Sequence, residues 1–154
     1  MTARFLTSGE RDLAQAVYGD ALALDAIEIR RRTWFPFQPR DTVMAPCGHL
    51  HFHPAGTAYR DDFSQAQIGA RGLFVHELCH VWQTQRRGRY VLPLMRHPFC
   101  RYGYAIEPGK PLVRYGIEQQ AEIVRHGYML REGYPLPGAA PLALYDALLA
   151  QLRR

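Results

Sequence analysis

The chain has 154 residues, of which 47% are hydrophobic and 21% charged, and its formal net charge is +5. This length suits one domain over residues 1–154, and no stretch approaches the roughly 18 consecutive apolar residues of a membrane-spanning helix. The arginines lie at the ends of predicted elements rather than among aromatic residues, which argues against a nucleic-acid partner.

The N-terminal segment lacks the apolar core of a cleaved signal peptide. We therefore expect a cytoplasmic protein, or one exported by a dedicated machine without such a peptide. The three cysteines, Cys47, Cys79 and Cys100, form no CxxC pair. We expect them to be free thiols of a reducing compartment that bind no metal.

The N-terminal half predicts one helix and a small sheet. Thr7 can cap a helix, with Glu10 completing a capping box and Gly19 ending the helix. Residues 26–30 alternate in polarity, which predicts a short strand. Residues 43–53 predict a hairpin that turns at Pro46-Cys47-Gly48.

The sequence of the C-terminal half predicts mainly helices. Residues 64–85 are rich in helix formers and precede Gly88, and a connection over 91–110 leads to a second long helix over 116–131. A last helix is predicted over 141–152. Mostly helices, with a small sheet near the middle, indicate an α+β fold.

The segment His76-Glu77-Leu78-Cys79-His80 lies within the first long helix. Residues four apart share a helix face, with Cβ atoms roughly 5–6 Å apart, so His76 and His80 can bind one zinc ion. Glu77 can then take a proton from the metal-bound water and return it to the leaving amine. The motif also arises by chance as two surface histidines, but apolar neighbours on both sides favour buried rings, which need a partner.

A catalytic zinc needs a third protein ligand and an open fourth position. The extended histidine motif is excluded because Gln83 and Arg86 stand at its positions. Glu118, on the next long helix, is the predicted third ligand, and Glu122 is predicted to accept a hydrogen bond from a ligating histidine. The alternative is a solvated acidic stripe on an amphipathic helix.

A second donor must stabilise the oxyanion of the intermediate, and tyrosine or histidine side chains often do so. The candidates are Tyr102, Tyr104, Tyr115 and His126. We rank Tyr104 and Tyr115 first, although each could equally be a core aromatic residue.

His49, His51 and His53 alternate along the predicted hairpin. They could form a second metal site, but no acid or cysteine nearby completes a ligand set, so we favour the polar face of an exposed strand. The same hairpin is the candidate edge for pairing with an extended peptide.

The segment HELCHVWQ at 76–83, followed by EQQAE at 118–122, resembles the gluzincin pattern HExxH…ExxA(D/E) of CAAX prenyl proteases and HtpX-type peptidases. The chain is more similar to the small metallopeptidases found beside Vgr, Rhs and contractile-injection-system genes, some of which share an N-terminal TxxE helix. The resemblance covers roughly residues 2–130.

This resemblance implies a minimal zincin-like domain, with the two motif histidines and Glu118 as zinc ligands and Glu77 as general base and acid. It also implies a peptide or protein substrate and an association with a secretion apparatus. The sequence departs from the family pattern at two positions: Cys79, where Thr or Gly is commoner, and Glu122, where many relatives have Asp.

Together these features predict a zinc-dependent hydrolase, foremost a peptidase. One alternative is a non-proteolytic accessory of a secretion or phage-tail-like apparatus with structural zinc, against which the presence of Glu77 argues. Another is an amidase of cell-wall peptides, which would use the same chemistry.

Overall fold

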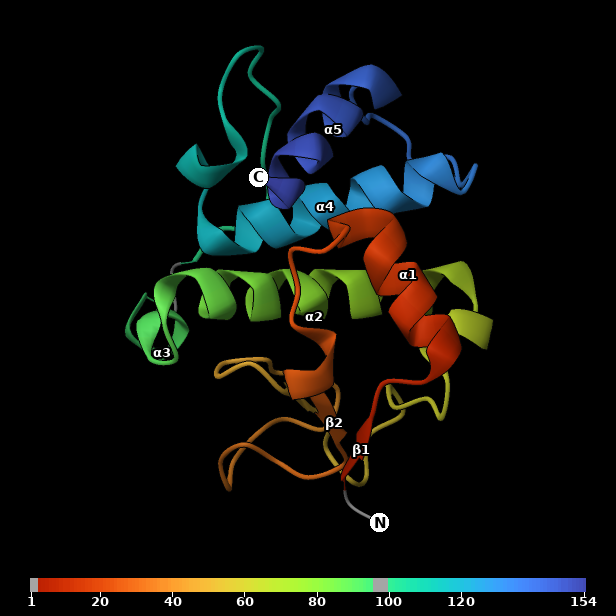
Figure 1. The fold of residues 1–154 in the computed structure, drawn as a ribbon, viewed down its shortest axis with the longest axis vertical. Coiled ribbons are helices and arrows are strands. Elements are labelled where there is room, and N and C mark those ends of the chain that lie inside the picture. The colour runs from red at the N-terminus through yellow and green to blue at the C-terminus, as the bar shows by residue number, and fades with distance from the viewer. Residues whose placement is uncertain (1–2, 96–99) are drawn as a thin grey trace.

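The computed structural model describes residues 3–95 and 100–154, and Figure 1 shows their arrangement. The elements in chain order are β1 (Ala3–Phe5), α1 (Ser8–Tyr18), β2 (Glu28–Arg30), β3 (Leu50–His51), α2 (Ile68–Arg87), α3 (Val91–Met95), α4 (Ile117–Arg131) and α5 (Leu142–Leu149). Helix α2 crosses the middle of the molecule, with the small sheet on one side and α4 on the other, and α5 packs against α4. The α+β prediction is confirmed.

The sheet has the order β1-β2-β3 and lies in the N-terminal part of the chain, not near its middle. β1 is antiparallel to β2, and β2 is parallel to β3. The predicted 43–53 hairpin is reduced to β3 and one antiparallel bridge between Met44 and His51. β1 was not predicted, because three residues are too few to show an alternating pattern.

Glu10 connects the start of α1 to the sheet and to the segment before α2. Thr7 and Glu10 form the predicted capping box. The buried Glu10 carboxylate also accepts two hydrogen bonds from Arg4 of β1, at 2.8 Å each, and one from the backbone N–H of Phe63 at 2.8 Å. These hydrogen bonds satisfy the buried carboxylate and fix the three segments to one another.

The two long helices were placed correctly by the sequence, apart from the first residues. Residues 64–67 precede α2, with Phe63–Gln65 forming a 3-10 turn. Gly72 of α2 faces Met129 of α4, and a Cβ there would stand 3.0 Å from the methionine sulfur. A glycine at this position therefore allows α2 and α4 to approach closely.

The predicted connection over 91–110 contains the short helix α3, and its residues 96–99 lie outside the described part of the chain. In the described residues, no helix combines the length and hydropathy that a membrane span requires.

Candidate metal centre

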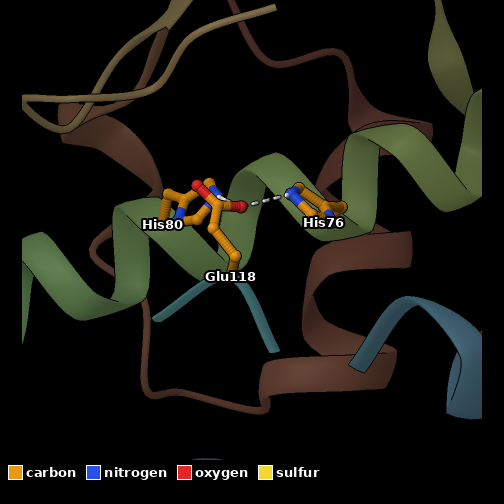
Figure 2. Close-up of side chains that lie close together, drawn as sticks. All are labelled: His76, His80 and Glu118. Atoms are coloured by element: carbon orange, nitrogen blue, oxygen red, sulfur yellow. Dashed lines mark hydrogen bonds and ion pairs between the residues drawn. The ribbon is translucent and has the colours of Figure 1, made fainter. Parts of the chain in front are cut away.

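His76 and His80 of α2 and Glu118 of α4 meet between the two long helices (Figure 2). Their ligand atoms all lie within 4.8 Å of one another, and all three residues are buried. Glu118 Oε2 lies 3.1 Å from His80 Nε2 and 3.4 Å from His76 Nε2. We call these three residues the trio; it is the set of residues that the sequence predicted as ligands.

The hydrogen bonds of His80 determine which of its ring nitrogens is protonated. Its Nδ1 lies 2.9 Å from Gln83 Oε1. The amide nitrogen of Gln83 donates to Ile117 O at 2.9 Å and to Gln120 Oε1 at 3.0 Å, so its oxygen faces His80. Because that oxygen can only accept, Nδ1 is the donor in this contact, and Nε2 is the ring nitrogen that faces Glu118.

His76 is held by a carboxylate instead. Its Nδ1 lies 2.9 Å from Glu122 Oε1, although the N–H is not aimed straight at that oxygen. Burial lowers the pKa of His76, but contacts with Glu118 and Glu122 outweigh burial and raise this pKa to about 9. Burial likewise opposes ionisation of Glu118, yet its contacts with the two histidines hold its pKa far below the usual range.

The three side chains converge closely enough to share a proton or a metal ion. Nitrogen lone pairs and a carboxylate oxygen repel one another at 3.1–3.4 Å unless a proton or a metal ion lies between them. A tetrahedral ion with ligand bonds of about 2.0–2.2 Å separates its ligand atoms by about 3.3–3.6 Å. The spacing and the donor types of the trio therefore fit a metal ion.

The trio opens into a cavity of about 320 Å³, which we call the polar cleft. Besides the trio it is lined by Asp41, Thr42, Val43, Leu73, Glu77, Tyr102, Glu122 and Arg125. Glu77 is buried and lines this cleft beside the trio, as its predicted role as proton acceptor requires.

Glu122 begins a chain of polar contacts that leads away from the trio. Its Oε2 lies 3.2 Å from His126 Nε2, and His126 Nδ1 lies 2.6 Å from the hydroxyl of Tyr104, which in turn lies 2.8 Å from the hydroxyl of Tyr145. Burial and the hydrogen bond with Tyr145 raise the pKa of Tyr104, so its hydroxyl remains protonated and can donate to His126.

The two tyrosines ranked first as oxyanion donors do not line the polar cleft. Tyr104 instead borders a groove of about 600 Å³, which shares Tyr102 and Glu122 with the cleft. The Tyr115 hydroxyl accepts a hydrogen bond from the backbone N–H of Glu107 at 3.0 Å. The path of residues 100–116 decides these positions, and the sequence pattern does not encode it. Of the four candidates named from the sequence, Tyr102 lines the cleft.

The three alternating histidines do not form an exposed strand face. His51 is buried, and burial lowers its pKa to about 4, so its ring is neutral. His49 and His53 accept hydrogen bonds from the backbone N–H groups of Glu28 and Ala55. Among the described residues, the trio is the one group of His, Cys, Asp and Glu placed to hold a metal ion.

Sequence reasoning missed the amide network behind His80. Gln83 and Gln120 are buried, and Gln120 donates to Tyr115 O at 2.7 Å. Gln83 follows His80 by three residues, a spacing that places both on one helix face. That spacing could have predicted the contact between Gln83 and His80, although glutamine in a helix is usually a surface residue.

No protein-family model matches this sequence. The type VI secretion system spike protein VgrG2b of Pseudomonas aeruginosa is 39% identical over 135 residues, which cover 82% of this chain and 13% of that protein. The solved effector domain of Pseudomonas aeruginosa VgrG2b is 32% identical with a TM-score of 0.76, over 98% of this chain and 84% of that domain. The chain thus spans about an eighth of the spike protein and most of its effector domain.

Proposed function

The chain belongs to the family of the effector domain of Pseudomonas aeruginosa VgrG2b, and we propose that it is a zinc-dependent peptidase associated with a type VI secretion system. The observation that carries the peptidase proposal is the position of Glu77, which lines the polar cleft beside the trio. A metal site that only stabilised the fold would need neither a neighbouring carboxylate nor an open cleft.

The donor set favours zinc among the common metal ions. Two imidazoles and one carboxylate form a ligand set that catalytic zinc uses in hydrolases, whereas magnesium and calcium prefer oxygen ligands alone. Bound by the trio, zinc would supply a Lewis acid that lowers the pKa of water toward neutrality. This gluzincin-like assignment is part of the proposal.

The side chains around the trio divide the remaining work. Glu77 accepts the proton of the attacking water and returns it to the departing amine nitrogen. The Glu122 carboxylate orients the His76 ring through its Nδ1, 2.9 Å away, and the neutral amide of Gln83 contacts the Nδ1 of His80 at the same distance.

The segment beside the cleft can orient an extended peptide. Met44 exchanges two backbone hydrogen bonds with His51, at 3.1 and 2.7 Å. Backbone groups alternate along an extended segment, so those of Val43 and Ala45 are expected to point away from His51, to the opposite edge. Val43 also lines the cleft. A substrate strand can pair with this edge, which keeps residues 43–53 as the proposed docking segment.

A second candidate is a non-proteolytic part of the secretion apparatus with structural zinc. The name of the spike protein relative supports an association with that apparatus more directly than it supports an activity. An amidase of cell-wall peptides would use the same residues on another substrate.

The decisive comparison is between the wild type, Glu77→Gln and a control, Glu107→Gln, whose side chain is 65% exposed and pairs with Lys110. Zinc content is measured by atomic emission, and hydrolysis with casein, peptide and cell-wall peptide substrates. We expect one zinc per chain in all three proteins, and loss of hydrolysis by about 100-fold or more in Glu77→Gln alone. Full activity in Glu77→Gln would contradict the mechanism, and zinc without hydrolysis in the wild type would favour the non-proteolytic accessory.

A further inference from the structure

A second cavity adjoins the trio on the side of His80 and Glu118, which supply polar groups to its lining. Its volume is about 180 Å³. The other walls are largely apolar and come from distant parts of the chain; they include Trp34, Met44, Ala45, Leu92, Pro93 and Ile117. We call this space the apolar cavity.

His80 and Glu118 line both the apolar cavity and the polar cleft. Glu77, His76 and Arg125 line the cleft but not the cavity. The trio therefore stands at the border between a polar and an apolar compartment. A peptide with its reacting bond at the trio reaches the cavity with a side chain next to that bond.

We propose that the apolar cavity receives one bulky apolar side chain, aliphatic or aromatic, of a peptide substrate, adjacent to the bond that is cleaved. This proposal rests on the proposed peptidase function and specifies its substrate class.

The size and chemistry of the cavity support this occupant. An apolar protein cavity of about 150 Å³ is large enough to hold benzene, so a space of about 180 Å³ accommodates a phenyl or isobutyl group. Moving a Leu- or Phe-sized side chain out of water into this space is favourable, whereas a charged side chain would lose its hydration among walls that are largely apolar.

The wall residue Trp34 is held in place although its side chain faces solvent. The residue is 42% exposed, and its backbone N–H donates to Gln38 Oε1 at 2.8 Å. The buried Gln38 in turn donates to Thr42 O and His51 O, which attaches this loop to the sheet. An exposed indole on an anchored loop at the rim of an apolar cavity offers apolar surface to a ligand.

The test uses zinc-binding hydroxamates, because their binding does not depend on turnover. Acetohydroxamate, 4-methylpentanohydroxamate and 3-phenylpropanohydroxamate share one chelating group and differ in their apolar tail. Their Kd values for the zinc-loaded protein are measured by calorimetry, and tryptophan emission is recorded in parallel. Trp34 and the buried Trp82 are the two tryptophans of the chain.

We expect the two long-tailed compounds to bind about 10-fold or more tightly than acetohydroxamate and to shift the emission to shorter wavelength. Trp34→Ala should remove the emission shift and reduce the preference for the long-tailed compounds by about 5-fold or more, while the affinity for acetohydroxamate stays unchanged. The matched control is Phe37→Ala, because Phe37 lies three residues away, is 86% exposed and does not line the cavity.

Equal binding of all three hydroxamates would overturn the proposal while leaving the proposed metal site intact. The proposal is overturned in the same way if Trp34→Ala and Phe37→Ala behave alike. Failure of every hydroxamate to bind the zinc-loaded protein would instead contradict the open metal site, and with it the peptidase function on which this inference rests.

Discussion

His76 and His80 lie one turn apart on α2, yet the structure holds their rings in different ways. His76 faces the carboxylate of Glu122, whose side chain is 16% exposed at the polar cleft. His80 faces the neutral amide of Gln83, which is buried beneath α4 and is 2% exposed. Water reaches Glu122, so its charge is tolerated beside His76. Water is excluded from Gln83, and its neutral amide avoids the cost of burying a second carboxylate beside His80.

This comparison predicts different consequences when each support is removed. The carboxylate strengthens the ligand by its charge, whereas the amide mainly satisfies buried polar groups. Loss of Glu122 should therefore weaken the metal, and loss of Gln83 should mainly weaken the fold.

Glu122→Ala should lower zinc affinity by about 10- to 100-fold, because outer-shell partners of ligating histidines have effects of this size. Its effect on the free energy of unfolding of the metal-free protein should be smaller than that of Gln83→Leu. Zinc affinity is measured by competition with a chelator of known Kd. Glu132→Ala is the control, because Glu132 is partly exposed and pairs with Arg71 near the other end of α4. Unchanged affinity in Glu122→Ala would remove the proposed role of this carboxylate.

Gln83→Leu should lower the free energy of unfolding by about 1–3 kcal/mol, because Ile117 O and Gln120 Oε1 lose their donor while remaining buried. Its effect on zinc affinity should be smaller than that of Glu122→Ala. Urea unfolding with and without zinc separates the two quantities. Gln65→Leu, at an exposed glutamine before α2, should change neither. A Gln83 variant that lost zinc more severely than Glu122→Ala would reverse the comparison.

The metal-free protein should become less stable as pH rises. The pKa of His76 is raised from 6.5 to about 9 by folding, so the folded protein binds more protons between these values than the unfolded chain does. The stability from this ring is fully present below pH 6.5 and is lost as pH rises through 9, by an amount on the order of 3 kcal/mol.

Unfolding of the chelated protein at pH 6, 7.5 and 9 measures this loss. His76→Gln should abolish it, and zinc should suppress it because a ligating ring is already unprotonated. Equal stability of the metal-free wild type at pH 6 and pH 9 would show that His76 is not held as described.

The smallest effect is expected from Tyr104→Phe. This change removes the hydroxyl that bonds His126 and Tyr145. The hydroxyl lies three contacts away from His76, through His126 and Glu122. We expect a loss of about 1 kcal/mol in stability and less than a threefold change in zinc affinity. Tyr134→Phe, at an exposed tyrosine, serves as the control. A loss of zinc as large as that of Glu122→Ala would mean that the chain of contacts acts as one unit.

Local patterns predicted the parts of the site that depend on local geometry. The spacing of His76 and His80, the capping box at Thr7 and the helix that carries Glu118 follow from residues a few positions apart. The positions of Tyr104 and Tyr115 depend on the long connection between α2 and α4, which carries no periodic signal. The burial of Gln83 and His51 results from tertiary packing, which overrides their usual surface preference.

The central claim is that the trio holds one zinc ion, and anomalous diffraction at the zinc edge tests it most directly. Crystals of the protein purified with zinc should show one strong anomalous peak about 2.0–2.2 Å from His76 Nε2, His80 Nε2 and a carboxylate oxygen of Glu118. The same measurement on Glu118→Gln should show the peak weakened or absent. Stoichiometric zinc whose anomalous peak lay elsewhere, or survived unchanged in Glu118→Gln, would contradict the account.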